Sequence, residues 1–150
     1  MSDIQVKKRN NTDEPLDIEK MHKVVFYACE GITGVSASEV EIKSSLQFYS
    51  GITSTEIQET LIKSAADLIS EENPNYQWVA GRLINYHLRK NVYDSFVPWP
   101  LLQTVKTNIE KGYYDDAILD QYTDEEWEIL DTYTRHERDE VLTYAAMEQW

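Results

Sequence analysis

Apolar residues recur at helical spacing along most of this chain. In the stretches 18–32, 57–68 and 76–87 they stand three or four positions apart, which is the period of one face of an α-helix. Start signals precede these stretches: Asp at an N-cap position, Ser or Thr followed three positions later by Glu, and an Asn-Pro pair. The pattern predicts four helices, the last running to about residue 93, which begin after Asp17, Ser36, Thr53 and Asn73.

The chain before Asp17 has a different pattern. Residues 4–9 are compatible with a short strand, residues 10–13 are turn-forming Asn, Thr and Asp, and residues 14–16 can return as a second strand. We therefore expect a β-hairpin that leads directly into the first helix.

Two prolines interrupt the helical pattern after the fourth helix. Pro98 and Pro100 cannot lie inside a helix, so we predict a domain boundary there, with residues 1–95 in one domain and 96–150 in the other. No stop signal follows Trp150, and we expect the sequence to continue in a longer protein. The second domain is expected to contain helices near 101–111, around Ala117, from Thr123 and over 137–149.

Composition limits the partners that we expect. The net charge is −13, and most of the excess acidic residues lie after residue 110, so the chain would repel a nucleic-acid backbone. There is neither a secretory signal pattern nor an apolar stretch of roughly 18 residues, so we expect no membrane partner. The single cysteine, Cys29, fits a cytoplasmic protein.

The sequence lacks the patterns of several enzyme and metal sites. Its glycines stand singly, so there is no glycine-rich phosphate loop. One Cys and three His give no zinc-ligand spacing, and the acidic residues between 115 and 126 lack the spacing of a calcium-binding loop. We predict no catalytic residue and no metal site.

One compact basic cluster lies on the predicted hairpin. Lys8 and Arg9 can converge with Lys20 on the first turn of the next helix, where the helix dipole favours an anion. Such a group can bind a polyphosphate, while Leu16 could pack on a purine and Glu14 could accept a hydrogen bond from its amine. From the residues alone two explanations stay open: a nucleotide site, and a solvated hairpin edge.

Many short segments occur in the order and spacing of one known family. They include VKKR at 6–9, LDIEKMH at 16–22, LQFYSGI at 46–52, IKSAADLI at 62–69 and NYQWVA at 75–80, with YTDEE at 122–126 and HERD at 136–139 further along. The chain resembles the N-terminal part of the large (alpha) subunit of class I, aerobic ribonucleoside-diphosphate reductases of the bacterial and phage type. The resemblance covers essentially the whole chain, and the first part resembles an ATP-cone.

This resemblance implies a fold, a ligand and partners. The fold would be mainly α: an ATP-cone, built as a four-helix bundle capped by a small β-hairpin or sheet, followed by additional helices. The ligand would be ATP or dATP, with Mg²⁺, acting as an allosteric effector, so that ATP permits activity and dATP suppresses it. The partners would be the remainder of the large subunit and the radical-generating small (beta) subunit, in the cytoplasm, or in the host cytoplasm for a phage protein.

The resemblance also implies which residues bind the nucleotide. The basic contacts are the pair Lys8 and Arg9 for the phosphates, Lys20, and Lys90 from the last cone helix. The remaining residues are Glu14, Leu16 and Asp17 around the base, Ser54 near the sugar and phosphates, and Gln58 at a position of nucleotide contact.

Several of these positions depart from the residues usual in the family. Asn10-Asn11 replaces Asp-Gly after the basic pair, Asp17 replaces Asn, Ser54 replaces Thr, and Gln58 replaces His. Because Asn tolerates a positive φ, the turn can survive. The departures bear on discrimination of dATP more than on formation of an ATP site.

The chain lacks the catalytic cysteines of this family, which needs a reducing pair and a cysteine that becomes a thiyl radical. Cys29 stands on the apolar stripe of the first helix, where we expect a core residue. We therefore expect a regulatory part of an oxidoreductase that is not active alone. Two alternatives stay open: a degenerate cone that only mediates subunit contact, and a free-standing ATP-cone regulator, whose four-cysteine zinc ribbon this chain lacks.

Overall fold

The computed structural model of the chain describes residues 4–149. The expectation that the sequence continues beyond Trp150 therefore concerns a position outside the described residues. It contains two compact units. One runs up to Leu88 and also includes the segment from Asp139 onward, and the other is Arg89–Arg138. Among residues 4–149, no helix combines the length and the apolar character that crossing a lipid bilayer requires.

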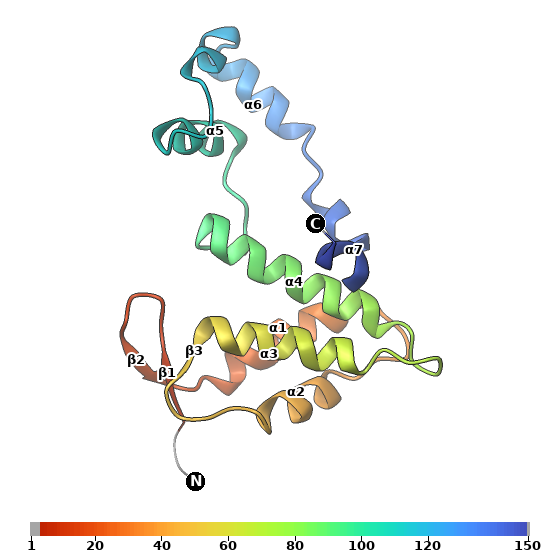
Figure 1. The fold of residues 1–150 in the computed structure, drawn as a ribbon. Coiled ribbons are helices and arrows are strands. Elements are labelled where there is room, and N and C mark those ends of the chain that lie inside the picture. The colour runs from red at the N-terminus through yellow and green to blue at the C-terminus, as the bar shows by residue number, and fades with distance from the viewer. Residues whose placement is uncertain (1–3, 150) are drawn as a thin grey trace. The chain divides into compact units, whose positions relative to one another are not determined.

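Four helices form the body of the first unit (Figure 1). Their apolar faces meet in one core, in which Val25, Val40, Leu61 and Leu83 are fully buried. The predicted fold class, mainly helical with a small β cap and further helices, is confirmed. The four helices are α1 (Ile18–Cys29), α2 (Ala37–Ser45), α3 (Ser54–Asp67) and α4 (Tyr76–Tyr93), whose last residues belong to the second unit.

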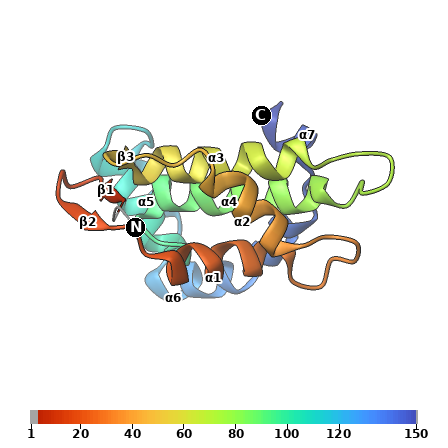
Figure 2. The ribbon, with the colours of Figure 1, turned by 90° about the horizontal axis from the view of Figure 1, so that it is seen from below.

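A three-stranded sheet lies at the end of the bundle where α3 begins (Figure 2). The predicted hairpin forms from β1 (Gln5–Lys7) and β2 (Asp13–Pro15), which pair antiparallel. A third strand, β3 (Ile52–Thr53), pairs parallel to β1 and was not predicted. Two residues are too few to show a strand period, and only the pairing with β1 makes them a strand.

The helix starts follow the predicted capping signals. The Asp17 carboxylate accepts a hydrogen bond from the Lys20 backbone N–H at 2.9 Å, and Thr53 forms a complete capping box with Glu56. The signal at Ser36 works differently. Its side chain caps α2, but its own N–H donates to the Tyr76 hydroxyl, which in turn donates to Glu39. A tyrosine from α4 thus completes the start of α2.

The second unit contains α5 (Leu101–Glu110), the 3₁₀ helix η1 (Asp116–Gln121) and α6 (Asp124–Thr132). The Asp131 carboxylate accepts a hydrogen bond from the Leu101 backbone N–H at 2.9 Å, which ties the start of α5 to α6. Trp127 is buried and packs edge-on against Tyr122. The helices predicted in this region near 101–111, around Ala117 and from Thr123 are all present.

The prediction of one helix over residues 137–149 is wrong. The structure has a 3₁₀ helix, η2 (His136–Val141), and a separate short helix, α7 (Tyr144–Glu148). The Thr143 side chain accepts a hydrogen bond from the Ala146 N–H, so Thr143 starts a new helix where the pattern predicted a continuous one.

Candidate functional site

The basic pair Lys8 and Arg9 lies on the turn between β1 and β2. The Lys8 N–H donates to the Thr12 carbonyl at 2.8 Å and the Asn11 N–H to the Lys8 carbonyl at 2.9 Å, which closes the turn. Asn11 has a φ of 62°, in the left-handed region that asparagine tolerates. The expectation that the turn survives with Asn10-Asn11 is therefore confirmed.

Lys8 is already paired with a carboxylate. Its ammonium lies 2.8 Å from Glu14 Oε1. Glu14 pairs with Val6, and Lys8 follows Val6 by two positions, so the Lys8 side chain extends on the same face of the hairpin. The hydrogen bond to Glu14 raises the pKa of Lys8. A phosphate that binds Lys8 must compete with this carboxylate or share the ammonium with it.

The start of α1 lies next in the chain to the hairpin. The Leu16 N–H donates to the Ile4 carbonyl at 2.9 Å, and the half-buried Leu16 side chain packs against the core. The Asp17 carboxylate caps the helix, so one of its oxygens is engaged with the Lys20 N–H. Lys20 itself has an exposed side chain on the first turn of α1. The predicted base-contacting residues thus also have structural roles.

The start of α3 lies at the same end of the bundle, because β3, which directly precedes α3, pairs with β1 of the hairpin. Lys7 pairs with Thr53, and Ser54 is the first residue of α3. Gln58 follows one turn later. Its side-chain oxygen, Oε1, is buried and has no hydrogen-bond partner among the described residues. A buried acceptor without a donor is costly, so this oxygen is suited to accept a hydrogen bond from a ligand.

The end of α4 within the first unit completes this group of elements. Burial, and then the positive charge of Arg9, lower the pKa of His87, while Glu59 opposes the shift. The charge of Arg9 also acts on the hydroxyl of Tyr86, whose pKa burial raises. Arg9 therefore lies near the part of α4 that carries Tyr86 and His87.

The sequence analysis assigned no role in the site to Tyr86 or His87. A signal was present, because residues three and four positions apart share a helix face, and Lys90 had been assigned to the site. Lys90 itself lies near the end of α4 in the second unit, and its part in the site stays a prediction. The roles of the other predicted residues, Lys8, Arg9, Glu14, Leu16, Asp17, Lys20, Ser54 and Gln58, stay predictions too.

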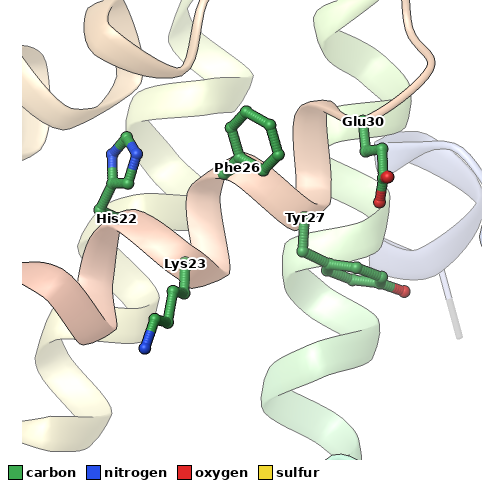
Figure 3. A pocket seen from close by; sticks show the side chains of 5 residues that line it. All are labelled: His22, Lys23, Phe26, Tyr27 and Glu30. Atoms are coloured by element: carbon green, nitrogen blue, oxygen red, sulfur yellow. The ribbon is translucent and has the colours of Figure 1, made fainter.

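An open hollow of about 260 Å³ lies elsewhere, along the outer side of α1 (Figure 3). It is lined by one helix and its end, and none of the predicted nucleotide contacts lines it. Beside it, His22 Nδ1 lies 2.7 Å from Glu41 Oε1 of α2. The hollow is therefore separate from the basic cluster, and its lining consists of His22, Lys23, Phe26, Tyr27 and Glu30.

The structure offers neither a reactive thiol nor a metal centre in the described part of the chain. Burial raises the pKa of Cys29 to about 11, so its thiol stays protonated at neutral pH. It packs against the core, as predicted. Within residues 4–149, no group of three or more His, Cys, Asp or Glu is placed to hold a metal ion.

A helical bundle capped by a small sheet with a basic hairpin is the architecture that the resemblance to an ATP-cone implied. Residues 4–91 match the family described as the ATP cone domain, and the chain belongs to that family. The chain as a whole is homologous to the N-terminal part of ribonucleoside-diphosphate reductase alpha subunits and is an ATP-cone regulatory region.

The relatives support this assignment over nearly the whole chain. Identity is 46% over 97% of the chain with ribonucleoside-diphosphate reductase subunit alpha of Haemophilus influenzae, and 45% over 96% with ribonucleoside-diphosphate reductase 1 subunit alpha of Escherichia coli. It is 37% over 97% of the chain with the subunit alpha of Enterobacteria phage T4. In each case the chain spans only 19% of the relative's length.

Proposed function

We propose that this chain binds ATP and dATP as alternative allosteric effectors and thereby controls the reduction of ribonucleotides to deoxyribonucleotides. The observation that carries the proposal is the meeting of the basic hairpin, the start of α3 and the end of α4 at one end of the bundle. The cations there suit a polyphosphate, and the unpartnered oxygen of Gln58 suits a donor group of the nucleotide.

Each element has a separate task in this proposal. Lys8 and Arg9 bind the phosphates, helped by Lys20 at the positive end of the α1 dipole and by Lys90. Ser54 and Gln58 contact the sugar and phosphates from α3. Glu14, Leu16 and Asp17 surround the base.

Mg²⁺ enters the proposal with the nucleotide. The described residues hold no carboxylate cluster that could serve as a dedicated metal site. Mg²⁺ is commonly bound through substrate phosphates and keeps several waters. We therefore expect it to be carried by the phosphates rather than bound by this chain before the nucleotide arrives.

The proposal includes partners that lie beyond this chain. The chain spans about a fifth of its relatives. Its single cysteine cannot supply the cysteine pair and the thiyl-radical cysteine that the resemblance implies for catalysis. We propose that residues 1–95 form the effector domain, and that residues 96–150 begin the body of a large subunit. That large subunit would work with a radical-generating small subunit in the cytoplasm.

The test is calorimetric titration of this chain with ATP and, separately, with dATP. We expect saturable binding of both, and the ratio of the two affinities measures how far Asp17 and Gln58 preserve discrimination. Replacing Lys8 and Arg9 together by Ala should abolish binding and leave the helical circular dichroism unchanged, because both residues lie on a turn.

The matched control removes two positive charges elsewhere in the same unit, by replacing Lys43 and Lys63 with Ala. It should keep wild-type affinity. Binding that survives the loss of Lys8 and Arg9 would contradict the proposed phosphate site. The absence of heat with either nucleotide, on a folded chain, would instead favour a cone that acts only in subunit contact.

A further inference from the structure

The chain returns to the first unit after the second unit is complete. The segment from Asp139 to Gln149, which we call the returning segment, packs with the unit that ends at Leu88. The Tyr27 hydroxyl donates to Glu140 Oε1 at 2.9 Å, and Tyr144 packs against the core. Figure 3 shows the Tyr27 side chain pointing away from α1, and Figure 1 shows α7 beside α4.

The backbone of the returning segment packs against α4 at Gly81. A Cβ added to Gly81 would overlap the backbone carbonyl oxygen of Leu142 and would lie 3.0 Å from the carbonyl carbon of Thr143. The other glycines all have positive φ and nothing within 4 Å of such a Cβ. Gly81 is therefore needed for close approach of the returning backbone, whereas the others serve backbone conformation.

Helix α4 connects the contact at Gly81, which we call the seat, to the candidate nucleotide site. Tyr86 and His87 follow Gly81 by five and six positions, and the positive charge of Arg9 acts to lower the pKa of both side chains. At 1.5 Å per residue, the seat lies roughly 8 Å along α4 from the site. A hydrogen-bonded helix carries a displacement over that distance without much bending, so the two places can influence each other.

We propose that the returning segment is a latch whose hold on Gly81 tightens when a nucleotide binds at the hairpin end of α4. The proposal rests on the proposed function, because it needs a nucleotide at that site. A nucleotide held by the hairpin, α1, α3 and α4 restricts their relative motion. A segment packed on α4 then separates from it less often, so its backbone hydrogen bonds are better protected from exchange.

The first test measures amide hydrogen exchange of the 150-residue chain residue by residue by NMR. Three amides report on the latch: Ala146, which donates to the Thr143 side chain, Met147, which donates to the Thr143 carbonyl, and Gln149, which donates to the Ala145 carbonyl. We expect saturating ATP to slow their exchange about fivefold, at the lower end of coupling between distinct sites. Unchanged exchange at these amides, with ATP binding established by calorimetry, would overturn the latch and leave the proposed function standing.

The second test releases the latch by mutation. Gly81→Ala favours α4 itself, because Ala is the better helix former, so the residue that must move is on the returning segment. We expect faster exchange of the three amides, loss of the ATP effect on them, and weaker ATP affinity. Coupling is reciprocal, so affinity should fall by the same factor, about fivefold, by which ATP had slowed the exchange.

Two further variants keep the test sharp. Tyr27→Phe removes only the hydroxyl that holds Glu140, leaves Gly81 intact, and should give the same changes at smaller size. Lys63→Ala on the exposed side of α3 is the control and should change none of them. A Gly81→Ala chain that keeps slow exchange and full ATP response would overturn the proposal, and a wild-type chain that binds no nucleotide would overturn both the latch and the proposed function.

Discussion

At the scale of single residues, the Gln58 oxygen supports the candidate site independently of charge. Lys8 has a carboxylate partner in Glu14, so its charge alone does not require a ligand. The Gln58 oxygen, by contrast, is buried without a donor among the described residues. A buried polar atom without a partner calls for an explanation, and a ligand that supplies the missing hydrogen bond is one.

Replacing Gln58 by Met separates stability from binding. The change removes the unsatisfied oxygen and keeps a similar length of side chain, so we expect the free energy of unfolding without nucleotide to rise by about 1 kcal/mol. For a chain of this size, the melting temperature should rise by about 2–4 °C. ATP affinity should fall about three- to tenfold through loss of one hydrogen bond.

Thermal unfolding and calorimetric titration check the two halves of that prediction. Gln77→Met on α4 is the control, since that residue is also half-buried but has no assigned role, and it should leave ATP affinity unchanged. A Gln58→Met chain with lower stability and unaltered affinity would show that the oxygen serves the fold rather than the ligand.

At the scale of elements, the capping box of α3 links the sheet to the site. Thr53 belongs to β3, and it also caps α3. The Glu56 carboxylate accepts from both the backbone and the hydroxyl of Thr53 and from the Tyr49 hydroxyl, and these hydrogen bonds lower the pKa of Glu56. This network fixes the direction in which α3 leaves the sheet, and therefore where Ser54 and Gln58 point.

We expect Thr53→Ala to weaken both the fold and nucleotide binding. Loss of a Thr cap costs about 1 kcal/mol, which corresponds to a melting temperature lower by about 2–4 °C. ATP affinity should fall severalfold because the start of α3 is less well fixed. The measurements are thermal unfolding and titration with ATP.

The second unit supplies a matched control in the capping box of α6. Thr123 caps α6 with Glu126 as Thr53 caps α3 with Glu56. Thr123→Ala should cost similar stability and leave ATP affinity as it is. Equal effects of the two substitutions on affinity would mean that binding follows overall stability and not the position of α3.

The element scale also shows where local patterns fail. The sequence signals at Asp17 and Thr53 predict helix starts correctly, because capping depends on residues within one turn. The region 137–149 has the composition of one helix, yet it folds as η2 and α7. The Thr143 cap of α7 is a local signal, whereas the contact of the Leu142 carbonyl with Gly81 joins residues far apart in sequence and leaves none.

At the scale of the whole molecule, the first compact unit is built from two stretches that are not consecutive in the chain. The second unit is inserted between two parts of the first, since residues from Asp139 onward pack with residues before Arg89. The first unit therefore depends on the last residues described. The proposed latch uses this arrangement, because the returning segment packs with the unit that is proposed to bind the effector.

We expect a chain that ends at Arg138 to be less stable than the full chain. It loses the packing of Tyr144 against the core and the hydrogen bond between Tyr27 and Glu140. Partial exposure of one large apolar contact and loss of one hydrogen bond cost about 2 kcal/mol. The melting temperature should fall by about 4–8 °C.

Differential scanning calorimetry of the two chains measures this loss. A chain with Tyr113→Ala, an exposed tyrosine of the second unit, serves as the control and should melt as the wild type does. Equal melting temperatures for the shortened and full chains would show that the returning segment adds nothing to the first unit.

The sequence by itself determined the helices, the hairpin, the basic pair and the family. Helical period, capping and turn formation involve residues a few positions apart, so they can be read along the chain. Only the tertiary structure decided the third strand, the meeting of Arg9 with Tyr86 and His87, the isolated oxygen of Gln58 and the seat at Gly81. Each of these depends on packing between segments distant in sequence, which local physical chemistry does not specify.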